Sequence, residues 1–492
     1  MRAALLAACI LAIPCSALAE PPVAGLNPDR CVSRFTQEPQ RLCLAAVAGD
    51  PAAQRAFARA LAEGLIVPRD DHAAAAFLQA AALAGNAGAA ADLGRMVETG
   101  RGLPRDLERA REWYRRAADG GDIMGAHFLG LILDEDGTRS RAQDLFAAAI
   151  RFAEPRLAQG DPDALFVTGA YTIGMPVVLG VSELRRDRVS EALARLRRAA
   201  DAGHVPASAL LGQLGLTQRS LVPDLRETRR RLAFAAARND RDACLALASL
   251  IIGTGGANAP EHPAALPLLH CAAEQGSAVA AHQLGNIYAD RSFAIGPSLA
   301  RFAYGPFLRP DLAAARRWYA RAAALGHAGA RFDLAIMLVR GEGGPHDEQG
   351  AIEALRAMIA GQADDAASLN QVAQAVVALP EAGRPLVEAA RDAVESAMRR
   401  RNPEGWVDTL ALAHLRLGEP ARAEALLRAE IARRGDPDNI DIVRYRIALG
   451  DVLAAQRRMA EARAEWERVL PQVRGMITET PVRRRIAEVA PQ

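Results

Sequence analysis

Histidine and cysteine, the residues best suited to bind a transition metal, are concentrated in one stretch of the chain. His262, His270, Cys271 and His282 lie within 21 residues of one another. Imidazole and thiolate are the ligands that zinc prefers. His270 and Cys271 are adjacent, however, and on a helix adjacent side chains diverge by about 100°. The pattern therefore predicts no metal site.

The cysteines favour structural disulfides over redox chemistry, because no CxxC pair occurs. Cys31 and Cys43 flank a short segment whose closure would contribute about 3 kcal/mol. Cys244 lies five residues after Asn239, and Cys271 lies five before Gly276. Two antiparallel helices would bring them to one level, so a bridge is plausible, while two free thiols remain the alternative.

Other catalytic and cofactor motifs are absent from the sequence. All 60 basic residues are arginine, so a P-loop lysine or a Schiff-base lysine is excluded. HExxH, GxSxG and a GxGxxG opening a helix do not occur. The acidic run at 134–137 lacks the spaced ligands of a calcium loop. We expect no enzyme activity and no cofactor.

The amino terminus is typical of an export signal. Arg2 precedes an apolar run from Ala3 to Ile13, and Ala17-Leu18-Ala19 fits a cleavage site that leaves Glu20 first. The run is too short to span a bilayer. A lipoprotein signal at Cys9 or Cys15 is disfavoured by position and by Pro14. We expect residues 1–19 to be removed near Ala19 and the mature chain to be periplasmic or secreted, without a transmembrane segment.

Length and charge limit the class of protein. The 492 residues carry a formal net charge of only +2, which gives no electrostatic attraction to nucleic acid or to an anionic membrane. The length instead indicates several domains or a repeat array.

A repeat is present. Glycine or asparagine recurs at intervals of 35 to 50 residues, which we call the marker column: Gly49, Gly85, Gly121, Gly160, Gly203, Asn239, Gly276, Gly326 and Gly361. Nine residues after a marker stands a small residue, as at Gly94, Gly130 and Gly285. Because glycine costs about 1 kcal/mol inside a helix, its recurrence predicts that another helix packs closely there.

The second half of each unit follows a turn and begins at an aspartate that suits a helix start, as at Asp70, Asp106, Asp224 and Asp311. Trp113-Tyr114 and Trp318-Tyr319 occupy matching positions in two units. The tryptophan position is otherwise filled by Phe77, Leu268, Arg195 or Arg231. A catalytic position would not tolerate such exchange, so these residues are interpreted as structural.

The pattern small-xxx-Leu-Gly, a Gly-rich turn and Asp-xxx-Ala-xx-Trp-Tyr-x-basic-Ala-Ala-xx-Gly resembles the Sel-one-like repeat, a relative of the tetratricopeptide repeat. The resemblance covers about residues 49–361. It implies an all-α fold, in which antiparallel helix pairs stack into a right-handed superhelix that usually serves as an adaptor surface for other proteins.

The remaining segments differ from this repeat. Residues 20–48 form an N-terminal segment with the Cys31–Cys43 pair. Residues 362–402, broken by Pro380 and Pro385, are interpreted as a helical joint. Residues 403–492 resemble tetratricopeptide units and a C-terminal tail, with Leu449-Gly450, Ala462 and Trp466 at the expected spacing.

The insertion at 289–310 is the strongest candidate for a binding site. It interleaves aromatic and arginine residues, which are favoured at protein interfaces: Arg291, Phe293, Arg301, Phe302, Tyr304, Phe307 and Arg309. Insertions in repeat proteins often lie on the binding face. The alternative is a loop that folds back on its own solenoid. A second, apolar insertion at 168–188 could likewise dock.

The resulting hypothesis is a non-catalytic periplasmic scaffold that binds an envelope or periplasmic protein during complex assembly or signalling, with no nucleic-acid partner. The first alternative is a carbohydrate-binding or polysaccharide-processing protein that stacks sugars on the loop aromatics. The second is a purely structural spacer.

Overall fold

A computed structural model describes residues 28–135, 139–174, 186–254, 260–290, 308–361, 366–400, 406–435, 440–476 and 478–488. Every regular element within these ranges is helical. The chain divides into two compact units, Met1–Ser277 and Ala278–Gln492. The boundary directly follows the marker Gly276 and so falls between two repeats. The all-α fold expected from the sequence is confirmed.

Unit 1 consists of helix pairs joined by short turns. Its α-helices are α1 (Pro28–Arg34), α2 (Gln37–Val47), α3 (Pro51–Glu63), α4 (Asp71–Leu83), α5 (Ala87–Thr99), α6 (Leu107–Asp119), α7 (Ile123–Glu135), α8 (Arg139–Leu157), α9 (Pro162–Gly174), α10 (Arg186–Asp201), α11 (Val205–Thr217), α12 (Leu225–Ala236), α13 (Arg241–Thr254) and α14 (Ala265–Glu274). A short 3-10 helix, η2 (His262–Ala264), precedes α14. From α3 onward, each odd-numbered helix packs against the even-numbered helix that follows it.

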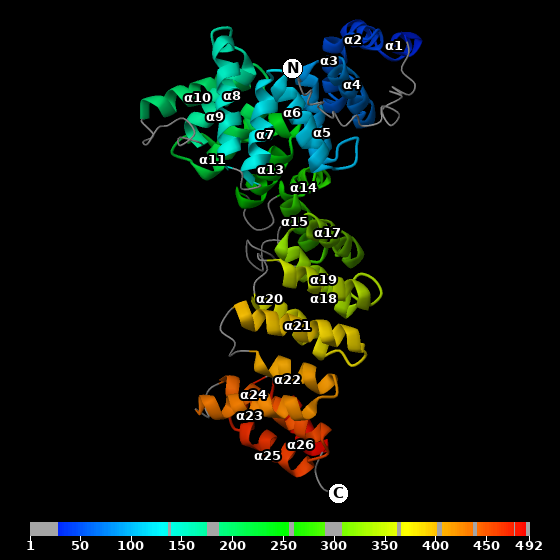
Figure 1. Ribbon diagram of the computed structural model, residues 1–492, viewed down its shortest axis with the longest axis vertical. Helices are drawn as coiled ribbons and strands as arrows, with labels where there is room; N and C mark the ends of the chain where they lie inside the picture. The colour runs from blue at the N-terminus through cyan, green and yellow to red at the C-terminus, as the bar shows by residue number, and fades with distance from the viewer. Residues whose placement is uncertain are drawn as a thin grey trace, which may run out of the picture. The chain divides into compact units, whose positions relative to one another are not determined.

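Unit 2 continues the same construction. Its helices are α15 (Ala278–Tyr288), α17 (Leu312–Ala324), α18 (Ala328–Arg340), α19 (Glu348–Ala360), α20 (Ala366–Val377), α21 (Arg384–Arg400), α22 (Val407–Arg416), α23 (Pro420–Arg434), α24 (Ile440–Ala455), α25 (Met459–Val469) and α26 (Glu479–Glu488). Figure 1 shows them as successive layers, from α18 and α19 in yellow-green to α25 and α26 in red.

The marker column forms the turn between one pair and the next. Eight of the nine markers have a positive φ, including Asn239 at 58°. Asparagine tolerates this left-handed conformation better than other side chains, which explains its place among glycines. Gly361 is the exception, with φ −73°. Helix α19 also ends at Gly361, but without the left-handed conformation, at the point where the regular repeat ends.

Aspartate begins the second helix of each regular pair. The carboxylates of Asp70, Asp106, Asp224, Asp311 and Asp347 each accept a hydrogen bond from a backbone N–H in the first turn. These N-H groups have no partner within the helix, so each cap contributes about 1 kcal/mol. The helix starts expected at the first four aspartates are confirmed.

The glycine column marks a close approach of two helices in one pair. A Cβ atom on Gly94 of α5 would lie 2.8 Å from the ring of Tyr114 on α6. On Gly285 of α15 it would lie 2.5 Å from the ring of Tyr319 on α17, and on Gly130 it would lie 2.6 Å from Phe146. The glycines therefore make room for a large side chain from the second helix.

That large side chain is the tyrosine and not the preceding tryptophan. Tyr114 and Tyr319 are fully buried, whereas Trp113 and Trp318 are half-buried. The tyrosine hydroxyls are paired with Glu98 at 2.6 Å and with Asn286 at 2.7 Å. The core between the two helices of a pair is therefore formed by the tyrosine, and the tryptophan lies at its edge.

Candidate functional site

The aromatic loop expected to bind a partner lies mostly outside the described residues. This applies to Arg291, Phe293, Arg301, Phe302, Tyr304 and Phe307, and also to residues 1–19, which were expected to form an export signal. Arg309 is described, and it is exposed two residues before Asp311, the N-cap of α17. Most of the second insertion, residues 175–185, is likewise outside the described ranges.

The four cysteines that the structure describes form two disulfides. Cys31 of α1 is bonded to Cys43 of α2, and Cys244 of α13 is bonded to Cys271 of α14. The second bridge joins the two helices of one pair, as the antiparallel register requires. Cys271 is therefore a cross-link and not a metal ligand.

The histidines that could suggest a metal site are dispersed into separate roles. In the part of the chain that the structure describes, no group of three or more His, Cys, Asp or Glu side chains could hold a metal ion. His262 is fully buried beside α14. His282 of α15 contacts Asp333 of α18, with 2.9 Å between Nε2 and Oδ2, and its ring lies 4.2 Å from that of His327.

The His282–Asp333 pair has a counterpart in unit 1. Arg55 lies six residues after its marker, and Asp92 lies seven after the next marker, as do His282 and Asp333. The Arg55 Nε and Asp92 Oδ2 atoms are 2.7 Å apart. Both pairs join the first helix of one repeat to the first helix of the next, so they are interpreted as contacts between repeats.

Unit 2 carries an open groove of about 700 Å³ over α17, α18 and α19. Its floor is apolar, with Leu334 and Leu338 from α18 between small side chains on the flanking helices. The small side chains are Ala313, Ala320, Ala323 and Ala324 on α17, and Ala354 and Ala357 on α19. Because alanine side chains are short, the floor between them stays accessible.

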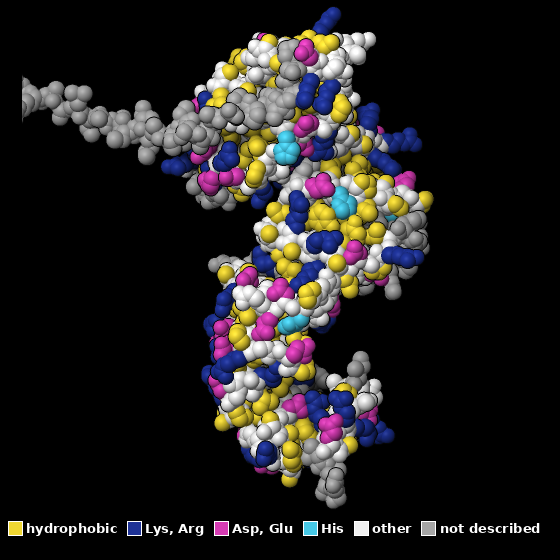
Figure 2. All heavy atoms as spheres, turned by 90° about the vertical axis from the view of Figure 1, so that its right-hand side faces the viewer, with side chains coloured by type: hydrophobic (Ala, Val, Ile, Leu, Met, Phe, Trp, Pro, Cys, Tyr) yellow, Lys and Arg dark blue, Asp and Glu magenta, His cyan; other side chains and the backbone are white. Residues whose placement is uncertain are grey.

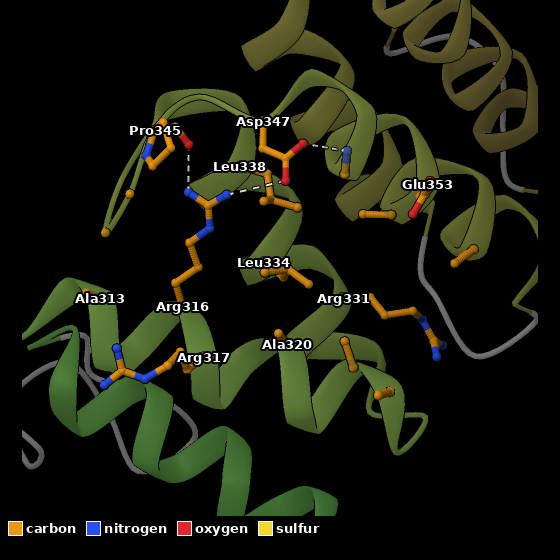
Figure 3. A pocket seen from close by; sticks show the side chains of 17 residues that line it. Ala313, Arg316, Arg317, Ala320, Arg331, Leu334, Leu338, Pro345, Asp347 and Glu353 are labelled. Carbon is orange, nitrogen blue, oxygen red and sulfur yellow. Dashed lines mark hydrogen bonds and ion pairs between the residues drawn. The ribbon is translucent and has the colours of Figure 1, made fainter.

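Charged residues lie at the edge of this groove. Arg316 crosses one end of it, where its guanidinium donates to the Pro345 carbonyl at 2.8 Å and lies 3.6 Å from the Asp347 carboxylate (Figure 3). Arg317 and Arg331 point away to opposite sides of the hollow (Figure 3). Arg317 is exposed and has no ion-pair partner among the residues described. With Glu353 as the remaining acidic lining residue, the edge has a small excess of positive charge.

Unit 1 contains a smaller cavity of about 240 Å³, which is lined mainly by the first helix of several helix pairs. Asp92 and Arg95 come from α5, Asp163 comes from α9, and His204 is the N-cap of α11. Arg95 reaches Asp240 at 3.0 Å, across 145 residues of sequence. The stacked pairs of unit 1 therefore curve until its early and late repeats meet.

The charges in this cavity are paired with one another. Asp92 accepts from Arg55 at 2.7 Å and from Arg59 at 2.8 Å. Burial alone would raise the pKa of the Asp92 carboxyl, but the two guanidinium groups outweigh it and hold the pKa at about 2. His204 Nε2 lies 3.0 Å from Asp163, and despite burial this contact keeps the pKa of Asp163 below its usual value. The Asp92 and Asp163 carboxylates therefore stay ionised at neutral pH.

Neutral buried groups adjoin the cavity. Burial, followed by the nearby Arg95, lowers the pKa of His127 on α7 to about 3, so its imidazole is uncharged at neutral pH. Its Nδ1 atom is 2.9 Å from the Tyr171 hydroxyl. The sequence patterns gave no sign of this contact, because it joins residues of two different repeats.

The comparisons with known proteins agree with this architecture. The Sel1 repeat model matches residues 51–86, 87–122, 293–327 and 328–353. The chain therefore contains Sel1 repeats. Proteins built of Sel1 and tetratricopeptide-like repeats generally mediate protein–protein interactions.

Several solved structures are similar over long stretches. A protective antigen of uropathogenic Escherichia coli with an SLR fold is 18% identical, over 95% of this chain and 91% of its own, with a TM-score of 0.42. A Sel1 repeat protein from Oxalobacter formigenes is 22% identical, over 69% of this chain and 92% of its own, with a TM-score of 0.36. A tetratricopeptide protein from Thermus thermophilus is 22% identical, over 43% of this chain and 98% of its own, with a TM-score of 0.28. No curated protein matches the chain.

The described helices include none that is long and apolar enough to cross a membrane. On the face shown in Figure 2, arginine and acidic side chains are interspersed with hydrophobic ones.

Proposed function

We propose that this protein is a non-catalytic scaffold that binds another protein through the outer surface of its helical repeats. The observation that carries the proposal is the groove over α17, α18 and α19, with its apolar floor and charged edge. Interfaces combine an apolar centre with a polar rim in this way, and adjacent helices provide a preformed surface for a partner segment.

The loop at 291–307, together with Arg309, is proposed as a second docking element. Its aromatic and arginine content is the support for this role. It precedes α17, which forms one wall of the groove.

The scaffold is proposed to act outside the cytoplasm, in assembly or signalling of an envelope complex. The signal-like pattern at residues 1–19 supports export. The Cys31–Cys43 and Cys244–Cys271 bridges are consistent with an oxidising compartment. Amino-terminal sequencing of the protein from cell fractions tests this part: a mature chain starting near Glu20 is expected, and a cytoplasmic chain starting at Met1 contradicts export.

The binding role is tested by in-cell crosslinking and affinity capture of the tagged full-length protein. Three variants are compared with wild type: deletion of 291–307, Ala354→Trp inside the groove, and Ala425→Trp on the exposed face of α23. A specific partner that is lost with either of the first two variants, and retained with Ala425→Trp, supports the proposal. The absence of any specific partner for the folded protein contradicts it.

A further inference from the structure

The groove in unit 2 corresponds to one missing side chain in the repeat. In five second helices, an aspartate N-cap fixes the register, and the residue seven positions later can be compared directly. These residues are Phe77, Trp113, Arg231, Trp318 and Ala354. Four are large, and only the residue of α19 is an alanine.

The large members of this set fill space against the repeat. Phe77 is 1% exposed and Arg231 is 8% exposed. Trp113 is half-buried and packs against the core of unit 1. A side chain at this position therefore normally covers part of the surface between two second helices.

Helix α19 is turned about its own axis in the same way as the other four second helices. The residues eight positions after the caps are Leu78, Tyr114, Leu232, Tyr319 and Leu355, and all of them are buried. Ala354 consequently faces the same direction as Trp113 in α6. Its short side chain leaves open the groove that it lines with Ala320, Leu334 and Leu338.

We infer that this groove receives a large aromatic side chain, tryptophan in the first instance, from an amphipathic helix of a partner protein. The inference rests on the proposed binding function and specifies its chemistry. Aromatic side chains bury about 150–250 Å² each and dominate the energetics of many interfaces. A partner helix fits because the groove runs between α17 and α19, and ridges of one helix pack into grooves between others.

The edge of the groove indicates which residues should flank the anchor. Arg316 is already occupied by Asp347 and the Pro345 carbonyl, while Arg317 is exposed without an ion-pair partner among the described residues. Acidic residues on the partner helix would complement Arg317, and such charges chiefly affect specificity and association rate. The partner is therefore an acidic amphipathic helix with a central aromatic anchor.

The test uses fluorescein-labelled synthetic peptides and the full-length protein. One peptide is an acidic amphipathic helix with a single central tryptophan, and its matched control carries alanine there. Anisotropy titrations are run with wild type, Ala354→Trp and Ala425→Trp. Thermal unfolding of each variant confirms that the repeat remains folded.

We expect the tryptophan peptide to bind wild type saturably. The alanine peptide should bind wild type at least about tenfold more weakly, and the Ala354→Trp variant should bind the tryptophan peptide at least about tenfold more weakly. Ala425→Trp should bind like wild type, and an Arg317→Glu variant should bind more weakly. Equal affinity of the two peptides, binding that is unaffected by Ala354→Trp, or no binding would overturn the inference.

Two further outcomes identify where an error lies. If wild type self-associates and Ala354→Trp abolishes this, the groove is covered by a second copy of the chain and the partner-helix inference is wrong. If neither peptide binds but in-cell capture still depends on the groove, the scaffold function stands and the aromatic-anchor chemistry fails.

Discussion

A Cβ atom added to Gly94 would lie 2.8 Å from the ring of Tyr114, closer than packed side chains tolerate. Tyr114 is fully buried and its hydroxyl donates to Glu98, so the ring has little freedom to move. We expect Gly94→Ala to destabilise the protein by about 1–3 kcal/mol, as overpacking does.

Gly253 on α13 is the matched control for this prediction, because nothing lies within 4 Å of its Cβ position. Gly253→Ala should be neutral or should stabilise by up to about 1 kcal/mol. Urea unfolding followed by circular dichroism compares the two. Equal stability of Gly94→Ala and wild type would show that the glycine column does not mark a close contact.

The ionised Asp92 carboxylate should stabilise unit 1 at neutral and mildly acidic pH. Its pKa is about 2 in the folded protein and about 3.9 in an unfolded chain. The folded pKa is the lower one, so this stabilisation is present above pH 4 and is lost as the pH falls through 2.

Asp92→Asn should therefore cost about 1–3 kcal/mol at pH 7, where Arg55 and Arg59 lose a charged acceptor. The difference from wild type should shrink as the pH falls from 4 toward 2. Asp242→Asn is the control, because Asp242 forms an exposed pair with its neighbour Arg241 and such pairs contribute little. A pH-independent difference for Asp92→Asn would contradict this account.

His127 predicts a second pH dependence, at milder acidity. Its pKa is about 3 in the folded protein and about 6.5 when unfolded, so the unfolded chain alone takes up a proton between these values. Stability should fall by about 1.4 kcal/mol per pH unit as the pH drops through this window. His127→Gln should remove this slope, whereas His72→Gln, at an exposed position, should retain it. An unchanged slope in His127→Gln would assign the pH dependence to other groups.

The disulfides should contribute measurably to stability. Replacing both Cys244 and Cys271 with serine removes the cross-link between α13 and α14, and we expect a loss of about 2–4 kcal/mol. For the wild-type protein, the intact mass under non-reducing conditions should be lower by four hydrogens than the mass of the fully reduced chain. Four alkylatable thiols in the unreduced mature protein would exclude both bridges.

Local sequence signals predicted most of the repeat. Asp106 marks a helix start, Gly121 marks a turn, and Gly94 marks a close packing contact, because each effect acts over a few residues. The sequence did not distinguish Trp113 from Tyr114, since both residues are large and aromatic, and the structure buries the tyrosine fully. Extending the comparison to Asp347 would have revealed Ala354 as the small member of its column.

Contacts between distant repeats could not be predicted in this way. Arg95 and Asp240 are 145 residues apart, and their contact depends on the rotation that accumulates over the intervening helix pairs. No local pattern records that rotation. The same limit applies to the cavity around Asp92 and His204, whose residues are unremarkable within their own repeats.

The most direct test of the scaffold account places a photo-crosslinking amino acid at position 320, in the groove of unit 2, or at position 425 on α23 as control. The full-length protein is irradiated in cells, and adducts are identified by mass spectrometry. The account predicts a discrete protein adduct from position 320 that is absent from position 425 and is lost when Ala354→Trp fills the groove. Position 320 yielding no adduct, or the same adducts as position 425, would contradict the claim that this groove binds a partner.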